Sequence, residues 1–157
     1  MPLLVEPLIS SFTLTMSKYP PSSEPFAAEI SSALEMYVRP VLNMTGGTFL
    51  GWINPREQIM LASNIPKLDS TAYAVQLGKI IETAFRTIQT RNQLGPVQIP
   101  EGILSSQFVV FFQAITNPSS EILAGQMGRA IDAFARMCIV TSMDVTSGGV
   151  PVVGPIQ

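Results

Sequence analysis

The chain has 157 residues, a formal net charge of −2 and no histidine. Charged residues make up 13% of it, against about 25% in a typical soluble domain. These values exclude histidine-dependent catalytic triads and metal sites. They also argue against a clustered basic face for nucleic acid. The length favours a single domain, and the low charge predicts a surface that is largely covered by other protein.

Residues 1–23 are predicted to form an extended N-terminal arm, because proline interrupts regular helix. Four prolines lie in this segment: Pro2, Pro7, Pro20 and Pro21. Between them, the alternation of Phe12, Leu14 and Met16 is typical of a strand. The start of the chain lacks the basic residues of a signal peptide, and we expect none.

A first helix is predicted over about 24–39. Ser23 is suited to cap it, Pro25 fits its first turn, and Pro40 should end it. Residues 48–63 allow two readings. A strand at 48–53 could return as a β-hairpin, or Asn54 and Pro55 could start a short helix, which we slightly favour.

Three further helices are predicted over about 70–92, 101–116 and 118–141, each from apolar residues spaced by three and four positions. The third of these four helices is expected to be the most buried, because apolar residues fill much of its circumference. Residues 21–42 also align with 118–139 without gaps. The two stretches share a Pro-Ser-Ser-Glu start and several later positions, which leaves open whether the chain contains a duplication.

Residues 144–157 are predicted to form an extended C-terminal arm. No charge follows Asp144, and five glycines and prolines between Gly148 and Pro155 are incompatible with helix. A solvated, disordered tail is usually polar and charged. The valines of this segment therefore indicate an arm that lies on a partner surface.

Few residues suggest chemistry. Glu57 and Asp69 are the least improbable carboxylate pair, and capping of helices explains them better. Cys138, the only cysteine, is expected to be a buried apolar residue. Three acid-to-arginine pairs at i, i+4 would support their helices or set the register between subunits: Glu35–Arg39, Glu82–Arg86 and Asp132–Arg136. We expect no catalytic residues, no metal and no cofactor.

The sequence thus predicts a mainly α fold, with a compact bundle of about four helices over 24–143 between the arms at 1–23 and 144–157. We expect a non-enzymatic subunit of a large protein particle that docks through its arms. In general character it is similar to small structural proteins of virus and phage particles, as at a capsid, neck, tail or baseplate. The predicted interface residues are Phe12, Leu14, Trp52, Val150, Val152, Val153 and Ile156.

The expected partners are other protein subunits, in a homo- or hetero-oligomer, and neither nucleic acid nor a membrane. No transmembrane segment is predicted, because the longest uncharged run, 102–120, is rich in polar residues. The chain would be cytoplasmic before assembly and then part of a virion or another large assembly. The alternative function is binding of an apolar small ligand in a pocket near Phe108–Phe112.

Overall fold

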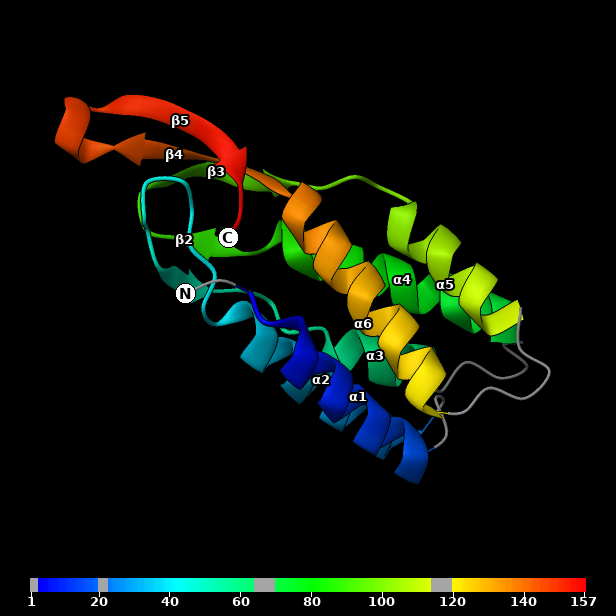
Figure 1. The fold of residues 1–157 in the computed structure, drawn as a ribbon. Coiled ribbons are helices and arrows are strands. Elements are labelled where there is room, and N and C mark those ends of the chain that lie inside the picture. The colour runs from blue at the N-terminus through cyan, green and yellow to red at the C-terminus, as the bar shows by residue number, and fades with distance from the viewer. Residues whose placement is uncertain (1–2, 20–22, 64–69, 114–119) are drawn as a thin grey trace.

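The computed structural model describes residues 3–19, 23–63, 70–113 and 120–157 (Figure 1). Its helices within these ranges are α1 (Val5–Lys18), α2 (Glu24–Val38), α3 (Arg56–Ser63), α4 (Ser70–Arg86), α5 (Ile103–Gln113) and α6 (Ser120–Met137). Its strands are β1 (Phe49–Gly51), β2 (Gln89–Thr90), β3 (Gln93–Gln98), β4 (Ile139–Asp144) and β5 (Val150–Pro155). The predicted mainly α fold is confirmed, but the helices do not form a clear four-helix bundle.

The prediction of an extended N-terminal arm is wrong, because residues 5–18 form α1. Pro7 lies in the first turn, where the missing N–H costs no helical hydrogen bond. The side chains of Leu8, Phe12 and Thr15 follow a helical spacing and are buried. The Thr15 hydroxyl donates to the Ser11 carbonyl at 2.9 Å, so this threonine is accommodated within the helix.

Two predicted helices end earlier than expected. The helix predicted over 70–92 stops at Arg86, and β2 and β3 follow it. The helix predicted over 118–141 stops at Met137, and β4 follows. In both cases β-branched residues at the end of the predicted range, such as Ile88 and Val140, enter or border strands, where they pack well.

The C-terminal segment is extended as predicted, but it is not a free arm. Its strand β5 pairs antiparallel with β4 over its whole length, and β4 pairs with β3 in a three-stranded sheet. The register places Ile139 opposite Pro155 and Asp144 opposite Val150. Of the two alternatives at 48–63, the favoured short helix is confirmed as α3 at 56–63. The hairpin is wrong, because β1 at 49–51 pairs with β2 at 89–90 and not with residues 58–62.

A three-part plan runs through the chain. Each of the long helices α2, α4 and α6 is followed by a β segment, which we define as residues 42–51, 89–98 and 139–155. Each of the first two β segments is followed by a shorter helix, which packs against the preceding long helix. The pairs are α3 on α2 and α5 on α4. The helix that packs against α6 is α1, from the N-terminal part of the chain.

Two stretches align in sequence, 21–42 and 118–139. Their described residues contain α2 and α6, each of which is the long helix of its unit. The helix α4 occupies the third such place. The two ends of the chain together complete the third unit: the Leu3 carbonyl accepts from Arg136 of α6, and Gln157 exchanges two backbone hydrogen bonds with Leu42.

The β segments are hydrogen-bonded to one another at one end of the helices (Figure 1). The first joins the second through β1–β2 and the Arg91 N–H, which donates to the Thr48 carbonyl at 2.9 Å. The second joins the third through β3–β4. The third returns to the first at Leu42, whose N–H donates to the Gln157 carbonyl at 2.8 Å.

The core lies between the helices and extends under the sheet. Its largest buried side chains include Phe12, Phe26, Phe85, Phe108 and Phe134. The helices α4 and α5 approach closely at Gly78, where an added Cβ would come within 2.4 Å of the Ser105 Cα. A backbone atom cannot move aside as the end of a side chain can, so this contact requires glycine.

We therefore expect Gly78→Ala to lower the free energy of unfolding by about 1–3 kcal/mol through overpacking. Gly125→Ala in α6 is the matched control, because its Cβ would meet only the end of the Arg129 side chain, at 3.0 Å. Alanine is the better helix former by about 1 kcal/mol, so this variant should be neutral or more stable. Urea unfolding measures both, and equal effects of the two variants would contradict the packing argument.

Candidate protein interface

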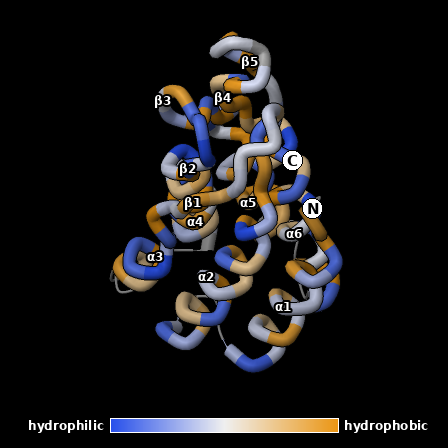
Figure 2. Tube along the Cα trace, turned by 90° about the vertical axis from the view of Figure 1, so that its left-hand side faces the viewer, coloured by the Kyte–Doolittle hydropathy of each residue, from blue (hydrophilic) through white to orange (hydrophobic). Residues whose placement is uncertain are grey.

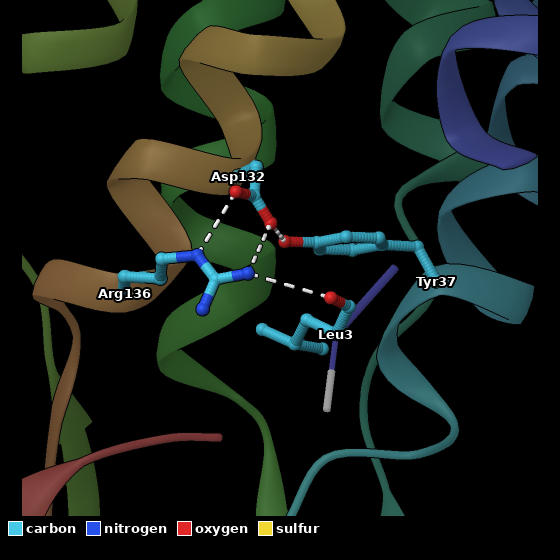
Figure 3. Close-up of polar contacts among 4 residues, drawn as sticks. All are labelled: Leu3, Tyr37, Asp132 and Arg136. Atoms are coloured by element: carbon cyan, nitrogen blue, oxygen red, sulfur yellow. Dashed lines mark hydrogen bonds and ion pairs between the residues drawn. The ribbon is translucent and has the colours of Figure 1, made fainter. Parts of the chain in front are cut away.

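A polar cluster links the segment just before α1 to α2 and α6 inside one chain (Figure 3). The Tyr37 hydroxyl of α2 donates to the Asp132 carboxylate of α6 at 2.6 Å. Arg136 binds the same carboxylate, with 2.9 Å between Nε and Oδ2, and donates to the Leu3 carbonyl at 3.4 Å. Burial and this carboxylate raise the pKa of Tyr37, so its phenol remains a donor. The cluster holds Leu3, just before α1, against α6.

The other two predicted acid-to-arginine pairs also serve the fold. Glu82 is buried, and its carboxylate accepts from the backbone N–H groups of Gly102, Leu104 and Ser105 at the start of α5. Arg86 pairs with Glu101 instead. An anion is stabilised by the free N–H groups of a helix N-terminus, so Glu82 fixes α5 on α4.

Glu35 plays the equivalent part between α2 and α3. Its carboxylate accepts from the Trp52 indole at 2.5 Å and from the Asn54 amide at 2.9 Å, just before α3. It also lies 3.9 Å from the Arg39 Nε, as the sequence predicts. In the first two units, the acid near the end of the long helix thus contacts the chain that leads into the paired helix. In the third unit, Asp132 binds Tyr37 of α2 instead.

Of the residues considered for chemistry, the structure describes Cys138 and Glu57. Cys138 is buried and its thiol donates to the Phe134 carbonyl. Glu57 is exposed, and Asp69 lies outside the described residues. Within the described ranges, no group of three or more cysteine or acidic side chains could hold a metal ion.

The seven predicted interface residues are distributed over several places. Phe12 and Ile156 are core residues, with 0% and 2% exposure, and are not available to a partner in this fold. Trp52 is half-buried and packs edge-on against Phe85, with 5.9 Å between the ring centroids. The exposed members are Leu14, Val150 and Val153, and Val152 is half-buried.

The three-stranded sheet carries an apolar outer face. The register aligns Leu94, Thr141 and Val153 across the strands, and residues paired in this way point to the same side. Val153 is 64% exposed, and Leu94 is 42% exposed. The face also includes Ile139, Met143, Pro151 and Pro155. We call these seven residues the outer face; none of them carries a charge.

The opposite side of the sheet is covered by the chain itself where it lies near the helices. Val140 and Ser142 are buried, and Gly154 lies so close to Met44 of the first β segment that a Cβ would come within 2.4 Å of its Cγ. The sheet stands at one end of the molecule, beyond the helices (Figures 1 and 2). Of the outer-face residues, only Val153 is predicted from the sequence, because Leu94 and Ile139 come beside it through strand pairing, which is a tertiary contact.

The open edge of β5 is poorly suited to pairing with another strand. The Ile156 N–H donates to the Cys138 carbonyl. In an antiparallel ladder, the backbone nitrogens of successive residues point alternately toward and away from the partner strand. Those of Pro151, Val153 and Pro155 therefore point away from β4. The prolines have no N–H, which leaves Val153 as the one donor among these three. Proline at an edge blocks strand addition, so a partner would have to cover the face.

Two grooves flank the C-terminal half of α2. The α1–α2 groove has a volume of about 420 Å³ and is lined by Leu4, Pro7, Leu8, Ser11, Ala33, Met36, Tyr37, Arg39 and Pro40. The α2–α3 groove, of about 810 Å³, shares Met36 and Arg39 with it. Met36 is 72% exposed and Leu4 is 54% exposed. Sequence periodicity does not reveal these residues, because Leu4 precedes α1 and Met36 lies on the exposed face of α2, whose other face is buried.

Near 108–112 the aromatic side chains pack on one another and on α4, and binding of an apolar ligand there stays a prediction. Phe108 is fully buried beside Phe111, and Phe112 packs edge-on against Tyr73 at 6.5 Å between centroids. The expectation that this helix, now α5, is the most buried is wrong, because Val110 is 58% exposed. The two grooves beside α2 are lined by other residues.

Comparison with known proteins gives no match: no family model, no curated protein and no solved structure is similar to this chain. Among the described residues, no helix is both long enough and apolar enough to cross a membrane.

The buried thiol and phenols predict loss of stability at alkaline pH. Burial raises the pKa of Cys138 from 9.0 to about 12 and that of Tyr73 from 10.0 to about 12. As the pH rises above about 9, the unfolded chain loses these protons first. The free energy of unfolding should therefore be constant below about pH 8 and fall between pH 9 and 12.

Urea unfolding from pH 7 to pH 11 measures this dependence, and Cys138→Ala should reduce the slope. The native thiol should also resist a disulfide reagent at pH 8 and react after unfolding, because the thiolate is the reactive form. Fast labelling of the native chain, or a flat pH profile above 9, would show that Cys138 is accessible.

Proposed function

We propose that this protein is a non-enzymatic structural subunit that associates with other protein subunits through the outer face of its β3–β4–β5 sheet. The observation that carries the proposal is the outer face itself. Leu94, Ile139 and Val153 are 42%, 39% and 64% exposed on one uncharged side of a sheet that projects beyond the helices. A contiguous exposed apolar patch marks an interaction site in soluble proteins.

The internal polar contacts support the same function. The acids of the three units contact their own chain, as Glu82 does at α5 and Asp132 does at Tyr37. Such groups stabilise the subunit and give no reactive centre. With 13% charged residues in the chain, little electrostatic repulsion opposes contact between subunits.

The class of assembly that we propose is a large particle, with a virion component as the best candidate. Its support is the sequence character: low charge, many prolines and glycines, and an apolar C-terminal segment. The structure adds a support of another kind, since a short projecting hairpin offers a rigid contact element on a small helical body.

Val153→Lys tests the proposal. A lysine at this position places a charge in the centre of the outer face, and burying an unpaired charge is strongly unfavourable. We expect the unmodified chain to form species larger than a monomer in light scattering over a concentration series. The variant should shift to the monomer mass.

Leu61→Lys on α3 is the matched control, because Leu61 is 63% exposed and lies outside the outer face. It should associate as the unmodified chain does, and circular dichroism should show that both variants are folded. An unmodified chain that is monomeric at all concentrations, or equal masses for the Val153 and Leu61 variants, would overturn the proposal.

A further inference from the structure

The outer face alone is too small for a symmetric dimer. Its sheet has three strands, and β4 and β5 have six residues each. With strands about 4.8 Å apart and a rise of about 3.3 Å per residue, the face covers roughly 300 Å². Two such faces packed together would bury about 600 Å², whereas stable interfaces bury about 1,200 Å² or more. A stable contact therefore needs a concave partner that takes the hairpin on more than one side.

The end of the β4–β5 hairpin is shaped for such a contact. Val145 and Val150 at this end are 65% and 53% exposed. Asp144 is the only charged residue between 137 and 157. Its carboxylate accepts from the N–H and hydroxyl of Thr146, which fixes it beside the turn. The hairpin end thus presents an apolar surface with one negative charge.

The α1–α2 groove presents the complementary surface. Leu4 and Met36 expose apolar side chains to it, and Arg39 is the one charged residue that lines it. The Arg39 side chain is 69% exposed, and its pairing with Glu35 is long, at 3.9 Å. Across Met36, the adjoining α2–α3 groove adds the exposed Arg56 and Glu57. The volume of the α1–α2 groove, about 420 Å³, is ample for small apolar side chains.

The hairpin cannot fill the groove of its own chain, because its end points away from α1 and α2 (Figure 1). We infer that the α1–α2 groove receives the end of the β4–β5 hairpin of a second copy, with Asp144 placed beside Arg39. This inference rests on the proposed function and names its partner surface. The contact joins two different surfaces, so copies add head to tail and form a ring or an open chain.

Complementary variants test the inference. Val150→Glu damages the hairpin end and leaves the groove intact, whereas Met36→Glu damages the groove and leaves the hairpin intact. Each variant alone should be monomeric in light scattering. An equimolar mixture should form a species of two copies and no larger, because one intact hairpin meets one intact groove. Met137→Glu is the matched control at an exposed methionine outside the groove, and it should associate as the unmodified chain does.

Charge reversal gives a second readout. Asp144→Arg and Arg39→Asp should each weaken association a few-fold, as expected for a pair near the surface, and the chain carrying both changes should recover.

Several outcomes would overturn the inference. If Met36→Glu associates normally while Val150→Glu and Val153→Lys do not, the proposed function stands, the hairpin docks elsewhere, and the groove serves another protein or an apolar ligand. A mixture that stays monomeric would also refute the head-to-tail contact. If Val153→Lys has no effect on the mass, the proposed function itself fails, so the two failures are distinguishable.

Discussion

The architecture depends on the hydrogen bonds that join the three β segments at one end of the helices. Strand pairs this short are marginally stable in isolation. Here each β segment gains further hydrogen bonds from a neighbouring β segment. The Arg91 N–H binds the Thr48 carbonyl, β3 pairs with β4, and Gln157 exchanges hydrogen bonds with Leu42. Because the last contact brings the end of the chain to the first β segment, the arrangement is closed. Because the helices adjoin the β segments in the chain, this pairing also sets the directions of the helices.

The acids near the ends of the long helices complement this arrangement. Glu35, Glu82 and Asp132 occupy the same place in their units, four residues before an arginine. Each of them binds donors on or next to another helix. A buried carboxylate is costly unless its lone pairs are satisfied, and Glu82 meets this requirement with three backbone N–H groups. These three acids thus help to specify how the helices pair.

Most helices were predictable from the sequence, but which helices and strands contact one another was not. The stripe and cap of α2 are local signals, and Ser23 accepts from the Phe26 N–H as a cap should. The helix α1 was missed because Pro7 was given the weight of an interior proline. The ends of α4 and α6 were placed too late, since pairing of distant strands decides them.

The candidate interface could be predicted only in part, for the same reason. The apolar character of 145–157 marks the region, and Val150 and Val153 are exposed there. Phe12 and Ile156 are also apolar residues in segments predicted to be arms, but both are buried in the core. Leu94 joins the face only because β3 lies beside β4. Hydrophobicity identifies residues that require burial, and only the fold distinguishes burial within the chain from exposure to a partner.

Comparison among the three units of this chain shows which part exceeds the needs of folding. The first β segment contributes a strand of three residues, and the second contributes β2 of two residues and β3 of six. These are sufficient to close the arrangement. The third segment has two strands of six residues, and the residues nearest the helices, Val140 and Ile156, already make its core contacts. The remainder, from Met143 through Val150, adds apolar surface that no described part of the chain covers fully, with Val145 and Val150 more than half exposed. Exposed apolar area of this kind gives no stability to a monomer. Its place at the end of a paired, proline-edged hairpin argues for a contact surface that the fold holds ready for another subunit.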